Sequence, residues 1–224
     1  MTGGGGSGSG GGSGGGSSIS QQHPTELKIQ YGDGLTEAEK AKQQAMFDKL
    51  PDHIKKKLFE SGTKVWVGTR ADKTPGWHAY AQETGRKSTD KIADGREVGS
   101  LSFYNGLRNE LYISVHHPGG SANVYTHELG HATDFQWRGD GQLISEDPEW
   151  VKLHTDNILN NPNINSYYRG GPSGKNAGSG RRELFAEGFA IYNEFGFPRL
   201  MGFVGSRAVA EQMVAIWKRY GVVE

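Results

Sequence analysis

The sequence predicts an α+β fold, in which one domain with a small mixed sheet and several helices follows a flexible tail. Two observations carry this prediction. Short segments with the period-two alternation of strands fall in the first half of the chain, whereas most segments with helical periodicity fall in the second half. Strands followed by helices, without strict alternation of the two, are typical of α+β proteins.

The amino-terminal residues differ from the rest in composition. Met1 to Ser18 are almost entirely Gly and Ser, so they have too little apolar surface to offset the entropy of ordering them. We therefore divide the chain into a disordered tether, residues 1–20, and one domain, residues 21–224. Roughly two hundred residues are enough to bury a hydrophobic core without disulfides.

The first half of the domain is expected to contain most of the strands. Glu26–Tyr31 alternates like a short strand, and Thr36 with Glu39 forms a capping box for a helix that must end near Pro51. A second helix is expected at Asp52–Ser61. Further strands are expected at Val65–Val67, Val98–Tyr104 and Leu111–Val115.

The second half is expected to be mainly helical. Ser121 is a favourable N-cap for a helix from Ala122 to Trp137, and Ser145 for one from Glu146 to Leu159. Asn160–Gly180 is rich in Asn, Gly, Pro and Ser, which predicts a long loop, and such loops are often functional. The last two helices are expected at Arg181–Phe195 and Ser206–Tyr220.

Composition excludes several classes of function. The 25 basic and 25 acidic residues cancel, so no net charge draws the protein to nucleic acid or to an anionic membrane. The absence of cysteine rules out disulfides and thiolate chemistry. No segment has the length of a membrane span or the pattern of a secretory signal, and the compartment stays unknown.

The motif that points to chemistry is HExxH, His127 to His131. On a helix, residues four apart lie on the same side, about 6 Å apart along the axis, so both imidazoles can reach one zinc ion. Glu128 then lies beside the metal and can accept a proton from water. Because Val124, Ala132 and Phe135 flank the motif, the helix is expected to be buried rather than a surface helix with two ordinary histidines. Gly130 inside it suggests that another segment passes close by.

A catalytic zinc ion usually has three protein ligands and one open position. Glu183 and Glu187 lie four residues apart on a predicted helix, among apolar residues. We predict that Glu183 is the third ligand and that Glu187 accepts a hydrogen bond from a ligand histidine, which would fix its tautomer. The alternative is a solvated helix surface that happens to carry two glutamates.

These motifs together resemble the anthrax lethal factor-type metallopeptidases, which include the bacterial Pro-Pro endopeptidases. The resemblance spans roughly residues 95–195 and rests on His127–Asp134 and Glu183–Phe189. It implies a zincin fold with a gluzincin site, in which His127, His131 and Glu183 hold one zinc ion and Glu128 is the base. It also implies a tyrosine that donates to the oxyanion, for which Tyr167 is the first choice and Tyr168 the alternative.

The expected substrate is a polypeptide that binds in an extended form. We predict that the strand before the motif is an exposed edge and that Leu111, Tyr112, Ile113 and Ser114 pair with the peptide; the alternative is an interior strand. His116 and His117 are interpreted as loop residues. Two other functions stay open, a metallopeptidase that cleaves peptidoglycan and a non-catalytic module stabilised by zinc, although structural zinc sites are normally closed by Cys and His ligands.

Overall fold

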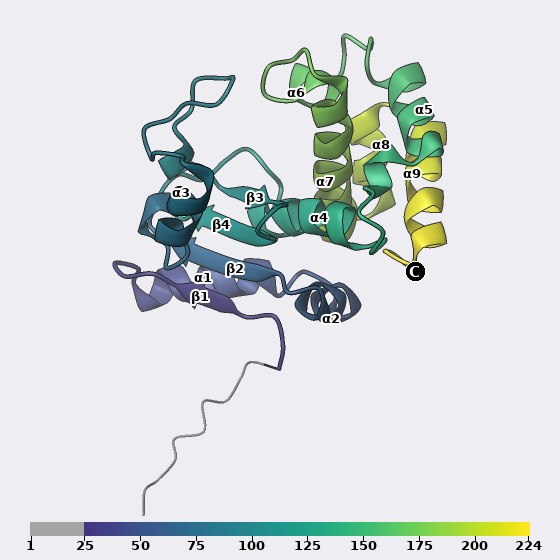
Figure 1. Ribbon diagram of the computed structural model, residues 1–224. Helices are drawn as coiled ribbons and strands as arrows, with labels where there is room; N and C mark the ends of the chain where they lie inside the picture. Colours follow the sequence, from purple (N-terminus) through teal and green to yellow (C-terminus); the bar gives the residue numbers. More distant parts are fainter. Residues whose placement is uncertain (1–24) are drawn as a thin grey trace, which may run out of the picture.

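A computed structural model describes residues 25–224, in which one sheet and three helices face a larger group of helices across a central helix (Figure 1). The predicted tether, residues 1–20, lies outside the described residues. The four strands are β1 (Ile29–Tyr31), β2 (Lys64–Gly68), β3 (Phe103–Asn105) and β4 (Glu110–Ser114). The fold is therefore of the predicted α+β class with a small mixed sheet.

The order of the strands overturns one prediction. The sheet runs β1, β2, β4, β3, with β4 parallel to β2 and antiparallel to β3. The strand expected to be an exposed edge, Leu111–Ser114, is therefore an interior strand, and all five residues of β4 are buried. The edge strand next to β4 is the short β3.

Both faces of β4 are covered, which explains why its sequence was misleading. Leu111 and Ile113 belong to the main core, whereas Tyr112 belongs to a smaller core with Tyr80 on the opposite face. The polar residues of the alternating pattern are satisfied inside the protein. The Tyr112 hydroxyl donates to Glu110, and the Ser114 hydroxyl donates to the carbonyl of Leu101 at 2.6 Å.

The helices of the first half agree with the predictions, apart from one that was missed. Thr36 caps the first helix as a capping box with Glu39. The predicted strand Val98–Tyr104 is wrong in its first part, because Val98–Ser100 forms a 3-10 turn (η2). The helices are α1 (Glu37–Phe47), α2 (Asp52–Glu60) and the missed α3 (Trp77–Thr84), with a further 3-10 turn η1 at Ala71–Lys73.

Two predicted helix caps are wrong, and both serines have other partners. Helix α4 (Val124–Gln136) is capped by Asn123, whose side chain accepts from the backbone N–H of Tyr125 at 2.9 Å. Helix α5 (Pro148–Asn157) is capped by Asp147. Ser121 instead donates to Glu187 at 2.7 Å, and Ser145 donates to Asp134 at 2.7 Å.

The predicted long loop at 160–180 is only partly irregular. It contains the short helix α6 (Ser166–Gly170), and the following helix begins at Ala177 rather than at Arg181. The remaining elements are η3 (Ile144–Glu146), α7 (Ala177–Phe195), α8 (Phe197–Val204), which was not predicted, and α9 (Arg207–Tyr220). Within residues 25–224, none of these helices is long and apolar enough to cross a bilayer.

Helix α7 contacts both α4 and α6, and glycines mark both contacts. A Cβ added at Gly130 of α4 would lie 3.2 Å from Cα of Ala186 on α7, so the predicted close approach of another segment is found there. A Cβ added at Gly180 would lie 2.2 Å from the carbonyl oxygen of Arg169 on α6. Helix α7 therefore fixes the position of α6 through direct backbone contact.

We predict that Gly180→Ala destabilises the protein, because the new Cβ would push α6 away from α7. Overpacking of this kind typically costs about 1–3 kcal/mol. Denaturant unfolding of the variant measures the loss. Gly178→Ala is the matched control on the same first turn, since its Cβ would meet only the side chains of Asn176, Arg181 and Arg182, none closer than 3.3 Å. Equal stability of Gly180→Ala and Gly178→Ala would contradict this account.

Candidate active site

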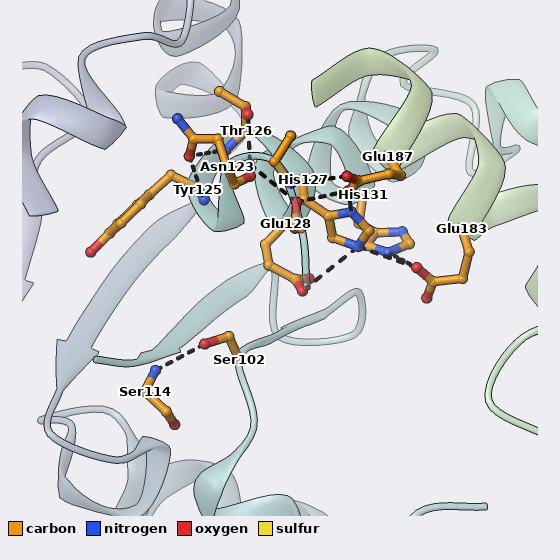
Figure 2. Close-up of polar contacts among 12 residues, drawn as sticks. Ser102, Ser114, Asn123, Tyr125, Thr126, His127, Glu128, His131, Glu183 and Glu187 are labelled. Carbon is orange, nitrogen blue, oxygen red and sulfur yellow. Dashed lines mark hydrogen bonds and ion pairs between the residues drawn. The ribbon is translucent and has the colours of Figure 1, made fainter. Parts of the chain in front are cut away.

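Helix α4 places the two motif histidines on one side. Their ring centroids are 5.0 Å apart, and Nε2 of each lies 3.2 Å from the same oxygen, Oε2 of Glu183. Figure 2 shows the imidazoles between Glu128 on one side and Glu183 and Glu187 on the other. Three atoms that can bind a metal therefore converge from α4 and α7.

The separation of these atoms fits a zinc ion. Ligands bound at 2.0–2.1 Å in a tetrahedral arrangement lie about 3.3 Å apart, close to the 3.2 Å between each Nε2 and Glu183 Oε2. Glu128 also clusters with the two histidines, but its nearest oxygen is 3.9 Å from Nε2 of His127. By these distances Glu183 is closer to the two Nε2 atoms than Glu128 is, and its role as the third ligand stays a prediction.

Glu187 contacts His127 at Nδ1, the ring nitrogen on the side away from Glu183. Its Oε2 lies 2.7 Å from Nδ1 of His127, while it also accepts from the Ser121 hydroxyl at 2.7 Å and from the backbone N–H of Ala122 at 3.0 Å. With Nδ1 donating to a carboxylate, the lone pair of His127 is at Nε2, which faces Glu183. This is the contact predicted for Glu187, and Ser121 is a partner that the sequence did not suggest.

Burial and close charges govern the protonation of the site. Burial raises the pKa of the Glu128 carboxyl above its usual value. Burial acts to lower the pKa of His127, but the contacts with Glu183 and Glu187 outweigh it and raise that pKa well above its usual value. Burial acts to raise the pKa of Glu183, yet the imidazoles of His131 and His127 hold it below its usual range. The centre therefore favours a cation.

The histidines open onto a cleft of about 1070 Å³. Both predicted tyrosines, Tyr167 and Tyr168, line it from α6, whose N-terminus is capped by Asn165 at 2.9 Å. The pKa of Tyr167 is raised by burial and then by the charges of Glu183 and Glu128. The pKa of Tyr168 is raised by burial and then by Glu187 and Glu183, and its ring packs on Phe203 at 4.9 Å. Of the two tyrosines, only Tyr167 has a pKa that the charge of Glu128 helps to raise.

The predicted substrate-binding residues do not line this cleft. Leu111, Tyr112, Ile113 and Ser114 lie inside the sheet, so the prediction that they form an exposed edge for a peptide is wrong. The cleft is lined instead by the edge strand β3 and by loop residues on either side. The predicted strand Val98–Tyr104 overlaps β3, but nothing in the sequence shows that β3 rather than β4 lies at the edge, because this depends on the order of the strands.

Other cleft residues were missed or placed only as loop residues. His117 lines the cleft, whereas Nε2 of His116 lies 2.6 Å from Glu39 on α1. Arg96 and Arg182 also line the cleft. Arg182 precedes the predicted ligand Glu183 directly, which is a signal the sequence did offer. Arg96 belongs to a loop without a motif, so no sequence pattern indicated it.

The fold recurs in a solved endopeptidase structure. This is the Pro-Pro endopeptidase PPEP-2 from Paenibacillus alvei, which matches with a TM-score of 0.59 and 16% sequence identity over 84% of this chain and 96% of that chain. The likeness shows a common fold. The sequence matches no protein-family model and no curated protein. The wider resemblance to lethal factor-type peptidases therefore rests on the two motifs and stays a prediction.

We predict that Glu187→Gln weakens zinc binding by about 10- to 100-fold, because the amide holds the His127 N–H less well than the carboxylate does. Competition against a chromogenic chelator measures the affinity. Glu194→Gln, a change of the same kind on the same helix but outside the cleft lining, is the matched control and should bind zinc like the wild type. Equal affinities of the two variants would exclude this role for Glu187.

Proposed function

We propose that the protein is a zinc-dependent metalloendopeptidase of the zincin type, with a gluzincin-like site. The observation that carries this proposal is the convergence of His127 Nε2, His131 Nε2 and Glu183 Oε2 at separations of 3.2 Å from the carboxylate oxygen, beside a buried Glu128. The fold shared with a solved Pro-Pro endopeptidase supports it. The three donors and the open cleft argue against a structural zinc site, which is normally closed by four ligands.

The roles of the residues follow from their positions. One zinc ion, when bound, acts as a Lewis acid that increases the acidity of water and polarises a carbonyl group. Glu128 takes the proton of the attacking water and passes it to the leaving amine, for which a pKa raised by burial is suited. The Tyr167 hydroxyl donates a hydrogen bond to the oxyanion of the tetrahedral intermediate. Glu187 keeps His127 in the tautomer whose Nε2 binds metal.

The peptide is proposed to bind along β3 rather than β4. One edge of β3 pairs with β4, and its residues Phe103, Tyr104 and Asn105 line the cleft. Burial raises the pKa of Glu128, and a hydrogen bond from the backbone N–H of Tyr104 is among the groups that oppose this rise. Tyr104 and the proposed base therefore lie close together in the cleft. An extended peptide paired with this edge would pass Glu128 and the histidines.

The test is digestion of a diverse peptide library, read by mass spectrometry. We expect internal cuts by the wild type, none after chelation, and a loss of rate of about 10²- to 10⁴-fold in Glu128→Gln, because the general base is removed. The variant should keep the wild-type unfolding midpoint and zinc content. Library peptides cut equally fast by Glu128→Gln would sink the proposal, whereas cleavage only of purified cell walls would assign the site to peptidoglycan.

A second prediction separates the two tyrosines. Loss of one oxyanion donor typically lowers kcat by about 10²- to 10³-fold, so Tyr167→Phe should lose this much activity on the best library peptide while it keeps its zinc. Tyr168→Phe should lose much less, since its ring packs on Phe203. Steady-state kinetics of both variants make the comparison. A larger loss in Tyr168→Phe would assign the oxyanion contact to Tyr168 instead.

A further inference from the structure

The acidic and the basic side chains that line the cleft lie in different parts of it. Its carboxylates are Glu128, Glu183 and Glu187, and all three face the histidines of the proposed zinc site. Its permanent cations are Arg86, Arg96 and Arg182. None of the carboxylates is free to bind a basic substrate side chain, while a divalent ion at the histidines would offset most of their charge. The rest of the cleft is therefore cationic, although the whole chain has equal numbers of acidic and basic residues.

Arg182 is the cation on the helical wall. Its guanidinium donates to the Ser179 hydroxyl at 3.0 Å, and none of the ion pairs among residues 25–224 involves it. Burial raises the pKa of Asp134 to about 6, and Arg182 is among the groups that act against this rise. The guanidinium therefore lines the cleft with donors left for a ligand.

Arg96 is the cation on the opposite wall, in the loop between α3 and β3 that faces α6 across the cleft (Figure 1). Its guanidinium pairs with Asp94 through Nη2 at 2.7 Å and Nε at 2.9 Å, and its side chain is 49% exposed, so a ligand in the cleft can still approach its charge. Burial is the main cause of the raised pKa of Tyr167, and Arg96 acts against it. The charge of Arg96 therefore acts on Tyr167, the proposed oxyanion donor.

The helical wall is basic beyond the cleft lining itself. Residues 158–182 contain no acidic side chain, and their basic residues are Arg169, Lys175, Arg181 and Arg182. Arg182 lines the cleft, so an approaching peptide would meet positive potential there, and the other three residues add positive charge to the same segment. Such a potential raises the association rate and the affinity of acidic ligands and disfavours basic ones.

From these positions we propose that the cleft selects peptides with Asp or Glu side chains next to the scissile bond, and that Arg182 and Arg96 are the residues that select them. The inference rests on the proposed function and specifies the class of substrate. The shared chemistry is a carboxylate, which a peptide supplies either from side chains or from its free C-terminus. Because the cleft is lined by a strand edge that can pair with an extended chain, side chains are the source proposed here.

The test measures binding separately from cleavage. Zinc-loaded Glu128→Gln is titrated with three pools of fluorescent, C-terminally amidated peptides that carry Glu, Gln or Lys on both sides of a degenerate centre. We expect the Glu pool to bind about tenfold more tightly than the Gln pool, with the Lys pool weakest and the difference reduced at high salt. Equal binding of the Glu and Gln pools would overturn the inference. The same pools are also prepared with free C-termini, and a preference that appears only in that form would overturn the inference as well.

Charge reversal in the same background tests the two arginines. Arg182→Glu and Arg96→Glu should each reduce or reverse the preference for the Glu pool. Arg207→Glu is the matched control, because Arg207 lies at the start of α9 outside the cleft lining and its side chain is 75% exposed; it should leave the preference unchanged. A preference that survives both cleft substitutions would also overturn the inference.

Wild-type cleavage of the same pools keeps the two proposals apart. Cleavage of the Gln pool without any acidic preference in binding would reject the charge selection and leave the peptidase proposal standing. Preferential binding of the Glu pool without cleavage of any pool would reject the peptidase proposal and leave a cleft that selects acidic peptides.

Discussion

The contact between α4 and α7 is the constraint on which the site depends. Gly130 lets the backbone of α7 approach α4, with only 3.2 Å from a Cβ at this position to Cα of Ala186. Because Glu183 and Glu187 lie one turn apart on α7, this single crossing presents one carboxylate to both Nε2 atoms and the other to Nδ1 of His127. The four side chains owe their geometry to the packing of two helices, and the same helix positions Tyr167 through the backbone contact at Gly180.

This arrangement concentrates charge in a buried place. Glu128 and Glu187 are both buried, yet neither belongs to the hydrophobic core that surrounds α4 and α7. Removing ionisable groups of this kind from water costs free energy, so they contribute little to the stability of the fold. Such groups are found most often at functional sites. Here the imidazoles of His127 and His131 offset part of the cost of burying Glu183 and Glu187, and a bound metal cation would offset more of it. Activity and stability are therefore expected to depend jointly on metal.

The sequence predicts which side chains share one face of a helix, but it does not predict the order of the strands in the sheet. HExxH and the two glutamates on α7 are local patterns, since helical spacing alone puts each pair on one face, and the structure brings these pairs together. Which strand forms the edge depends on the order of strands, and no local pattern contains it. In β4, the polar groups of Tyr112 and Ser114 suggest exposed positions, but their hydroxyls donate to Glu110 and to the carbonyl of Leu101 inside the protein. Arg96 was missed for the same reason, because its place in the cleft depends on which loops meet, whereas Arg182 is adjacent to Glu183 in the sequence.

The central claim is that His127, His131 and Glu183 hold one metal ion with Glu128 beside it. Anomalous diffraction at the zinc edge, from crystals of the zinc-loaded protein, tests it most directly. The account predicts a single strong peak at about 2.0–2.2 Å from both Nε2 atoms and from a Glu183 oxygen, with Glu187 still on Nδ1 of His127. A peak bonded to Glu128 in place of Glu183, or one away from the two histidines, would contradict it.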